Sequence, residues 1–383
     1  MVRKLITSLF PIVTLNIILG TALFAQTPII PAPPIIGAKS YLIIDATTNY
    51  EVGSLEPNLK LPPASITKLM TAYVTFQAIK NNQISLNDLV TISEKAWRME
   101  GSRMFIEVGK KVSVEDLLMG MIVQSGNDAS IALAEHVASS EFLFVDLMNQ
   151  SAAQLNMTST SFQNATGLPD QDHYSTAYDL SLLAKAIINE FPDYYKWYST
   201  KEFTYNNITQ KNRNALLWRD PSVDGIKTGS TNEAGYCLIS SAERNGMRLI
   251  SVVMGTATPK ARINGSQAML NYGFRFFETK KVFAAAEEII KTKTWKTESE
   301  SLSLGLSNEL KLTLPRGSFD NLDIDNNVPM QIIGPINKGQ TIGEVSVKLG
   351  ERTLAVEPLV ALDNNPNGTL WQQLRDTIQL WFE

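Results

Sequence analysis

The stretch Pro63-Ala64-Ser65-Ile66-Thr67-Lys68 is predicted to begin a helix, with Ser65 at its start and Lys68 one turn later. Because positions three apart share one face of a helix, the Lys68 amine can reach the Ser65 hydroxyl. A serine is a weak nucleophile until a base takes its proton, and a lysine whose pKa is depressed by burial can be that base. By itself the spacing is common, and it also fits a capping serine beside a solvated lysine.

The sequence on either side of this stretch predicts a domain with strands at its two ends and helices in its middle. Strands are expected at 41–45, 51–53, 235–242 and 247–255. Helices are expected from residue 64 onward, within 114–138 with a break near 124–127, and at 176–188. Asn245-Gly246 between the last two strands is a strong hairpin signal. This order favours an α+β or three-layer arrangement whose terminal strands share one sheet.

Two further short patterns carry groups that could serve a reacting serine. Gln124-Ser125-Gly126-Asn127 offers a hydroxyl for proton transfer and an amide that could orient a substrate carbonyl. Asp224-Gly225-Ile226-Lys227-Thr228-Gly229-Ser230 offers a cation, a hydroxyl and a small residue that lets a substrate backbone lie against a strand edge. Each pattern, taken alone, is also compatible with an ordinary loop or strand.

The three patterns together, S-x-x-K, S-x-N and K-T-G in that order, make up the signature of penicillin-recognising serine enzymes. The chain resembles the low-molecular-weight penicillin-binding proteins that are serine-type D-alanyl-D-alanine carboxypeptidases. It is most similar to the type with a second β-domain and a C-terminal amphipathic anchor. The resemblance runs from about Ala38 to Glu383, and it includes the segments 101–105, 164–168, 212–214 and 272–277.

The resemblance implies an α+β fold, a transpeptidase and β-lactamase-like domain with an antiparallel sheet and helices on both faces. It also implies roles for the motif residues. Ser65 would be the acylated nucleophile, Lys68 its base and Ser125 a proton-transfer group. The backbone N–H groups of Ser65 and Ser230 would form the oxyanion hole. The substrate would be bound by Asn127, Lys227, Thr228, Gly229, Ser230, Arg213 and Arg262.

The composition restricts the chemistry that is available. The chain has 383 residues, two His, one Cys and a formal charge of −4, so a nucleic-acid partner, a zinc site and an intramolecular disulfide are not expected. No cofactor or metal is expected either. His136 is predicted to pack within a helix, His173 to lie exposed in a polar loop, and Cys237 to be a small packed thiol.

The chain divides into five expected segments. They are a signal peptide at 1–25, an extended Pro-rich lead-in at 26–37, the catalytic domain at 38–279, a β-rich domain at 280–362 and an anchor at 366–383. Within the β-rich domain, strands are expected near 310–314, 330–333 and 345–349. Export without a disulfide framework favours a bacterial periplasm.

The C-terminal segment is predicted to be an amphipathic helix capped by Thr369. Its apolar arc comprises Leu370, Trp371, Leu374, Ile378, Trp381 and Phe382. The segment is too short to span a bilayer, so it would lie on the periplasmic face of the inner membrane as a peripheral contact. The competing interpretation is a helix that docks on the β-domain.

The resemblance implies peptidoglycan stem peptides as substrates and β-lactams as covalent inhibitors. Removal of the terminal D-alanine from a pentapeptide is the leading hypothesis, and cleavage of D-Ala cross-links is the nearest alternative. A β-lactamase is disfavoured because residues 161–170 contain no glutamate that could prime a deacylating water. A non-catalytic cell-wall scaffold is disfavoured because the set of motif residues is intact.

Overall fold

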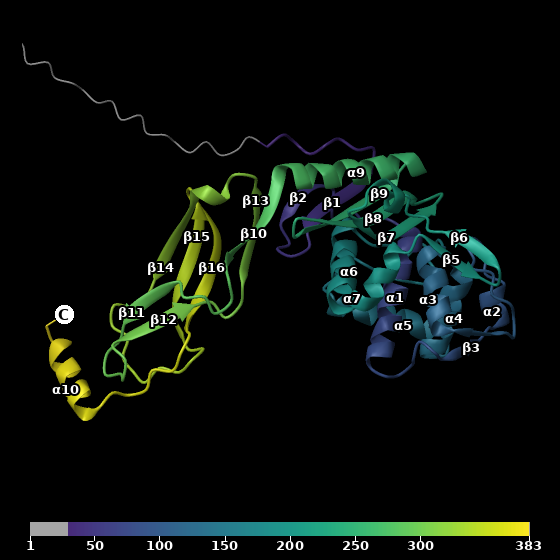
Figure 1. The fold of residues 1–383 in the computed structure, drawn as a ribbon. Coiled ribbons are helices and arrows are strands. Elements are labelled where there is room, and N and C mark those ends of the chain that lie inside the picture. The colour runs from purple at the N-terminus through teal and green to yellow at the C-terminus, as the bar shows by residue number, and fades with distance from the viewer. Residues whose placement is uncertain (1–29, 383) are drawn as a thin grey trace, which may run out of the picture.

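The computed structural model describes residues 30–382, so the expected signal peptide and part of the lead-in lie outside the described residues. Figure 1 shows a larger domain with a sheet and many helices, a slender β-domain beside it, and a short helix at the C-terminal end. Each domain has its own hydrophobic core. The architecture confirms the expected α+β domain followed by an all-β domain.

The larger domain is built on a five-stranded antiparallel sheet in the order β2-β1-β9-β8-β7. Its strands are β1 Ser40–Asp45, β2 Glu51–Leu55, β7 Val223–Thr231, β8 Gly235–Arg244 and β9 Met247–Thr256. Because β1 pairs with β9, the two ends of the domain share one sheet, as predicted. Asn245 and Gly246 both have positive φ, as expected for the tight turn between β8 and β9.

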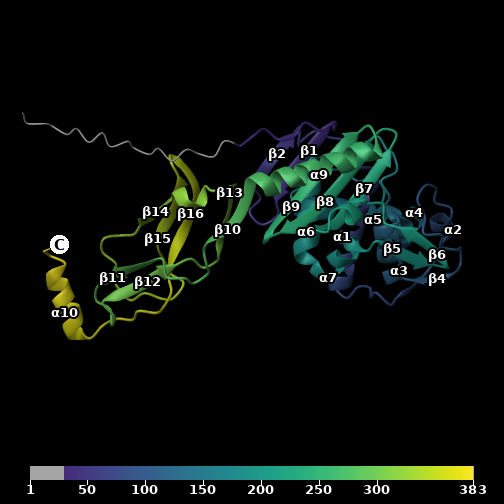
Figure 2. The same ribbon diagram turned by 45° about the horizontal axis from the view of Figure 1, so that its top comes forward.

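Helices cover both faces of this sheet because its strands are apolar on both sides. Ile43 and Val253 face one core, and their neighbours Leu42 and Val252 face the other. Helix α9 (Pro259–Phe276) lies across the first face, as Figure 2 shows, and α6 (Ala177–Glu190) packs on β1 and β9 from the opposite side.

The remaining elements of the larger domain form the helical region on that opposite side. The helices are η1 Ala64–Thr67, α1 Lys68–Lys80, α2 Glu94–Trp97, α3 Val114–Val123, α4 Asn127–Ala138, α5 Glu141–Gln154, α7 Pro192–Tyr195 and η2 Lys196–Ser199. The short helix α8 Leu216–Arg219 instead lies on the α9 side, where Leu216 and Leu217 pack in the same core as Ile43. Two small hairpins pair β3 Leu89–Thr91 with β4 Lys111–Ser113 and β5 Glu202–Tyr205 with β6 Ile208–Lys211. The expected break between α3 and α4 is present.

The second domain contains a five-stranded sheet in the order β11-β12-β16-β15-β14 and a separate β10-β13 pair. Its elements are β10 Phe277–Phe283, β11 Ile290–Lys293, β12 Ser301–Gly305, β13 Leu310–Pro315, η3 Phe319–Asn321, β14 Leu322–Asn327, β15 Thr341–Leu349 and β16 Arg352–Ala361. The prediction of a strand at 330–333 was wrong, because within this segment only Ile333 pairs, in an isolated bridge to Trp295.

Strand β10 connects the two domains. Phe277 at its start packs in the core of the larger domain, whereas Phe283 at its end packs in the core of the β-domain. The junction is tied by a hydroxyl network in which Thr279 Oγ1 donates to the buried Asp45 carboxylate at 2.6 Å. Thr313 Oγ1 is within hydrogen-bond distance of both Thr279 and Thr48, at 2.8 and 2.6 Å.

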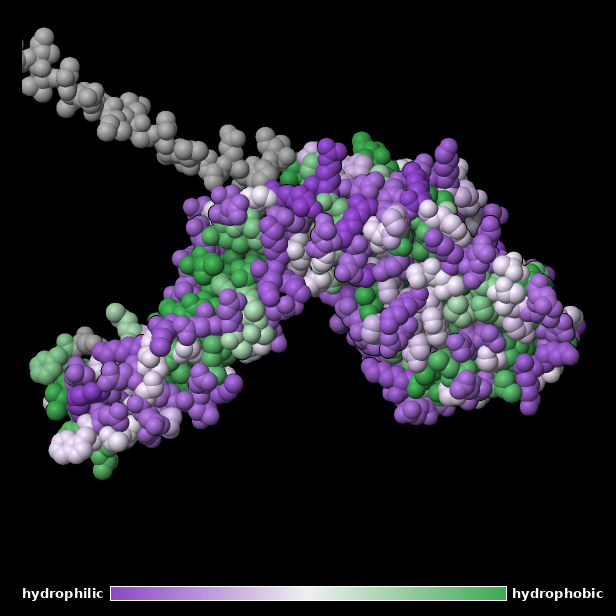
Figure 3. Space-filling model, in the orientation of Figure 1, coloured by the Kyte–Doolittle hydropathy of each residue, from purple (hydrophilic) through white to green (hydrophobic). Residues whose placement is uncertain are grey.

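Helix α10 (Leu370–Gln379) is preceded by Thr369, whose side chain forms the predicted N-terminal cap together with Gln372. Its polar side contacts the β-domain: Asp376 accepts a 2.7 Å hydrogen bond from the Lys296 backbone N–H, and Arg375 pairs with Glu300. The predicted apolar residues are at least half exposed, and Figure 3 shows hydrophobic side chains at this end of the molecule. Trp381 and Phe382 follow the helix rather than continue it.

Within residues 30–382, no helix combines the length and the apolar character that crossing a membrane requires.

Candidate active site

Ser65 lies in the 3-10 turn η1, one turn before Lys68 begins helix α1. The Lys68 Nζ donates to the Ser65 Oγ at 3.1 Å, as the spacing predicts. It also donates to the Thr166 carbonyl at 2.6 Å, and this second partner comes from a loop that sequence reasoning did not assign to the lysine. The two contacts hold the amine beside the hydroxyl that it would deprotonate.

The lysine is almost completely buried, and its surroundings disfavour the protonated form. Burial, followed by the positive charge of Arg213, lowers the pKa of Lys68 from its ordinary value to about 7, while Asp128 opposes the shift. A lysine with this pKa is about half neutral at pH 7 and largely neutral above it, so it can accept a proton. The geometry therefore provides a serine paired with a usable base.

Two glycines allow other segments to approach the serine closely. A Cβ built on Gly167 would lie 1.8 Å from the Ala64 carbonyl oxygen, and one on Gly229 would lie 2.8 Å from the Pro63 carbonyl oxygen. Gly229 was expected to make room for substrate on β7, but its missing side chain makes room for η1. These contacts bring β7 and the 164–168 turn against the start of the serine helix.

Ser125 occupies the break between α3 and α4 in a left-handed conformation, with φ of 66°. Its Oγ is buried and has no hydrogen-bond partner among the atoms of residues 30–382. Buried hydroxyls are nearly always hydrogen-bonded, so an unpartnered one at a strained backbone position is a mark of a functional site.

Asn127 and Asp128 begin helix α4 and hold the neighbouring loop. The Asn127 side chain donates to the Glu100 carbonyl at 2.6 Å. The buried Asp128 carboxylate accepts from the backbone N–H groups of Met104 and Phe105, at 3.0 and 2.9 Å. Sequence reasoning missed Asp128, although it directly follows the S-x-N motif. Because its charge acts on Lys68, the start of α4 lies near the serine–lysine pair.

A group of cations surrounds the K-T-G motif. Lys227 is buried, and burial, followed by the charges of Lys68, Arg213 and Arg262, holds its pKa well below the ordinary value. Thr228 beside it is buried as well, and the Lys227 Nζ donates to the Thr228 carbonyl at 3.2 Å. Concentrated positive charge of this kind favours an anionic ligand.

The two predicted arginines differ in position. Arg213 is exposed and has no ion-pair partner among the described side chains, which leaves it free to meet a carboxylate. Arg262 is buried, and its guanidinium donates to the Gly229 and Cys237 carbonyls at 3.2 and 3.4 Å. Arg262 therefore braces the β7–β8 pair, and its charge reaches the site only through space.

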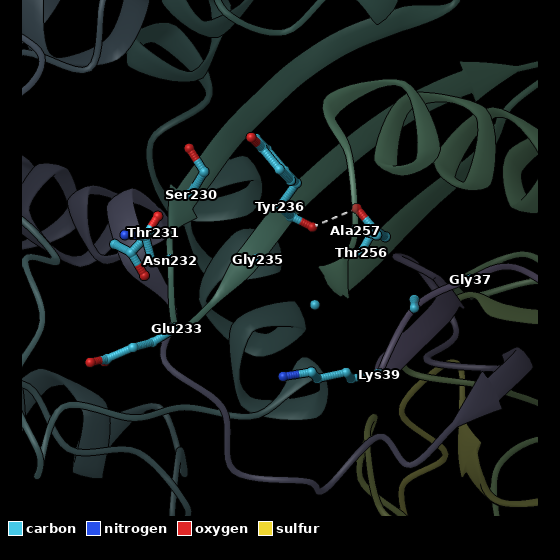
Figure 4. A pocket seen from close by; sticks show the side chains of 12 residues that line it. Gly37, Lys39, Ser230, Thr231, Asn232, Glu233, Gly235, Tyr236, Thr256 and Ala257 are labelled. Carbon is cyan, nitrogen blue, oxygen red and sulfur yellow. Dashed lines mark hydrogen bonds between the residues drawn. The ribbon is translucent and has the colours of Figure 1, made fainter.

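A pocket of about 680 Å³ adjoins the end of β7. Ser230 lies on one side of it and Lys39 on another, as Figure 4 shows, and the Thr256 hydroxyl donates to the Tyr236 carbonyl in its wall. Of the predicted site residues only Ser230 lines this pocket, so it adjoins the serine–lysine pair at the end of β7 and does not contain it.

The remaining rare residues are placed as follows. His173 was predicted to be exposed, and this was wrong: it is buried and contacts Thr67. The loop carrying it is polar in sequence but folds back against α1, and this long-range contact leaves no local sequence signal. His136 is half-buried near Asp88, and Cys237 is a buried free thiol, as expected.

Comparison with known proteins identifies both domains. A family model described as D-alanyl-D-alanine carboxypeptidase matches residues 27–258, and one described as penicillin-binding protein 5, C-terminal domain, matches residues 277–366. The chain is 39% identical to the D-alanyl-D-alanine carboxypeptidase DacC of Escherichia coli, over 94% of this chain and 92% of that protein.

Solved structures agree with these matches. Penicillin-binding protein 5 from Haemophilus influenzae superposes with a TM-score of 0.82 at 39% identity, covering 88% of this chain and 100% of that one. Penicillin-binding protein D2 from Listeria monocytogenes, solved in an ampicillin-bound form, has a TM-score of 0.59 at 29% identity, covering 64% of this chain and 100% of that one.

Proposed function

Because the chain belongs to the D-alanyl-D-alanine carboxypeptidase family, we propose that it removes the terminal D-alanine from peptidoglycan stem pentapeptides through an acyl-enzyme on Ser65. The observation that carries the proposal is the 3.1 Å contact between the Ser65 Oγ and the Nζ of a buried lysine whose pKa is lowered to about 7. No imidazole, thiol or metal is required for such a pair.

In the acylation step, neutral Lys68 takes the Ser65 proton as the Oγ attacks the penultimate D-alanine carbonyl. The developing oxyanion is held by the backbone N–H groups of Ser65 and Ser230. The D-alanine amine leaves with a proton passed through Ser125, whose unpartnered hydroxyl supports this role. Water then attacks the ester as Lys68 takes its proton, and Lys68 returns this proton to the Ser65 Oγ as the peptide carboxylate leaves.

The terminal carboxylate of the substrate is bound by the cationic end of the site. Arg213 and the Thr228 hydroxyl contact it, while Lys227 and the bracing Arg262 add positive potential. Asn127 orients the amide of the preceding residue, and the peptide lies along the edge of β7 beside Gly229. These assignments are supported by the exposed position of Arg213 and by the close packing of β7 on η1.

The same serine would be acylated by β-lactams, in keeping with the ampicillin-bound relative. We further propose that the protein is exported, with a signal peptide at 1–25 and a catalytic domain at 38–279. It would work at the periplasmic face of the inner membrane, with α10 as a peripheral contact. The exposed apolar side of α10 supports this last assignment.

The direct test is to incubate purified protein with a pentapeptide ending in D-Ala-D-Ala and to measure free D-alanine. Wild-type protein should release it and should give a penicillin adduct by mass spectrometry, whereas Ser65→Ala should do neither. Ser139→Ala, at the C-terminal end of α4, is a matched control and should behave as wild type. Release by Ser65→Ala protein would refute the proposal.

Two further substrates separate the alternatives. A cross-linked peptide dimer that is cleaved faster than the pentapeptide would make the enzyme an endopeptidase. Rapid steady turnover of a β-lactam would make it a β-lactamase. We expect slow release of the penicilloyl group and a preference for the pentapeptide.

A further inference from the structure

The buried imidazole of His173 lies outside the three sequence motifs. It belongs to a segment held at both ends by backbone pairing, with Ser161 paired to Tyr174 and Leu61 paired to Ser175. The ring meets Phe162 edge-on at 5.7 Å, and only 3% of the residue is exposed. A buried imidazole is retained at low energetic cost only if its nitrogens have partners.

Both ring nitrogens have a partner, and the pattern determines which one carries the proton. The Gln163 backbone N–H donates to Nδ1 at 3.2 Å, so Nδ1 is the acceptor. Nε2 therefore carries the proton, and it donates to the Thr67 Oγ1 at 2.7 Å. One side chain thus bonds both the loop backbone and the residue adjacent to Lys68.

The loop that His173 attaches is the one that contacts the base. The Thr166 carbonyl accepts from Lys68 Nζ at 2.6 Å, and the adjacent Ala165 carbonyl accepts from Thr71 Oγ1 at 2.7 Å. Between Gln163 and these carbonyls lie only one and two residues, so a shift of the loop at Gln163 moves the acceptor of the lysine.

We propose that His173 is a positioning residue for Lys68: it clamps the 163–167 loop to Thr67 and so keeps the Thr166 carbonyl on the lysine amine. The inference rests on the proposed function, since it concerns the base that activates Ser65. His173 does not touch the serine or the lysine, so it acts only through the loop and Thr67.

Burial of the ring keeps this clamp constant while Lys68 titrates. Burial, with a smaller contribution from the charge of Lys68, lowers the pKa of His173 to about 4, and Asp170 opposes the shift. Lys68 in turn faces Arg213, Lys227 and Asp128. His173 therefore stays neutral through the pH range in which Lys68 gains or loses its proton, and the hydrogen bonds to Gln163 and Thr67 persist.

The test measures the second-order rate of acylation by a fluorescent penicillin, across the pH range that brackets the Lys68 pKa. His173→Ala removes both bonds, His173→Asn retains an acceptor near the Nδ1 position, and His173→Gln retains a donor near the Nε2 position. His136→Gln is the matched control at the other histidine. Rates are normalised to the folded fraction by circular dichroism.

We expect His173→Ala to acylate roughly 10- to 100-fold more slowly, the scale of a misplaced catalytic group. Its pH midpoint should rise, because a loosened loop admits water to Lys68 and relieves the desolvation that lowers the pKa. His173→Gln should recover most of the rate, His173→Asn less, and His136→Gln should match wild type.

The clamp is refuted if folded His173→Ala protein acylates at the wild-type rate, or if it is slower with an unchanged pH midpoint, since a general packing defect lowers the rate alone. A rate for His173→Gln no better than for His173→Ala would also overturn it. Wild-type protein that shows no Ser65-dependent acylation would instead refute the proposed function, so the two failures are distinguishable.

Discussion

Lys68 combines two features that rarely occur together, complete burial and an ionisable amine. The residue pairs with the Ser65 hydroxyl and the Thr166 carbonyl, and no carboxylate of residues 30–382 forms a hydrogen bond or ion pair with it. Burial disfavours its charged form, so the protein gains a base at the expense of stability. The serine–lysine pair is therefore a site where stability and reactivity oppose each other.

Lys68→Met should reveal this conflict as a pH-dependent difference in stability. An unfolded lysine holds its proton up to its ordinary pKa of 10.5, whereas the folded one releases it near 7. The folded wild type therefore loses stability as the pH falls between these values, by about 1.4 kcal/mol per pH unit.

Urea unfolding of both proteins at about pH 9 and about pH 7 measures this loss. From pH 9 to pH 7 the free energy of unfolding of Lys68→Met, relative to that of the wild type, should rise by about 2–3 kcal/mol. The variant is nevertheless expected to be inactive. A difference that does not change with pH would contradict the lowered pKa.

At the scale of elements, the site depends on how closely loops approach the start of α1. Gly167 and Gly229 contact η1 where a Cβ would overlap backbone atoms, and Ala64 itself has a positive φ of 49°. The sequence places these glycines in recognisable motifs, but glycine is required there because the elements pack so closely.

Gly167→Ala should weaken both the fold and acylation. Gly167 has a positive φ, and a Cβ added there would overlap the Ala64 carbonyl oxygen. Gly109 has a similar φ, but a Cβ added there would have no atom within 4 Å, so Gly109→Ala is the control. The control should lose about 1 kcal/mol from backbone strain alone, and Gly167→Ala at least about 2 kcal/mol more, from the overlap. Thermal unfolding and penicillin acylation measure the two effects, and equal losses would show that the close contact is unimportant.

The outward face of α10 should bind lipid through apolar contact. Gln substitutions at Leu374 and Ile378 should reduce co-sedimentation with phosphatidylcholine vesicles by more than about tenfold, since each removes a large apolar group. Arg375→Ala, on the side that contacts the β-domain, should have a much smaller effect. If the double variant sediments as wild type, α10 is not the anchor.

At the scale of the whole molecule, the two domains are joined through β10 and the hydroxyl network around Asp45. Asp45 is fully buried; one carboxylate oxygen accepts from the Thr47 and Thr48 backbone, and the other accepts from Thr279. This arrangement couples the site-bearing domain to the domain that carries α10.

Asp45→Ala should uncouple the domains, because it leaves those donors without their acceptor at a cost of roughly 2–4 kcal/mol. Calorimetry should show the two domains unfolding further apart in temperature than in wild type. Asp363→Ala, at an exposed aspartate, is the control. Unchanged transitions in the Asp45 variant would mean that β10 alone provides the coupling.

Local spacing was enough to predict that Lys68 can reach Ser65, and to predict the Asn245-Gly246 hairpin and the Thr369 cap. Each involves residues that are neighbours along the chain, where backbone geometry decides which groups meet. The order of the three motifs was enough to identify the family, and short apolar runs bounded by turn residues were enough to predict β1, β2, β8 and β9.

Only the tertiary structure decided the properties that make the pair reactive. Lys68 meets Thr166 from 98 residues away, and Thr67 meets His173 from 106 residues away. Burial of the lysine, the inward position of His173 and the bracing role of Arg262 all follow from such contacts. Desolvation depends on everything packed around a group, which no local pattern encodes.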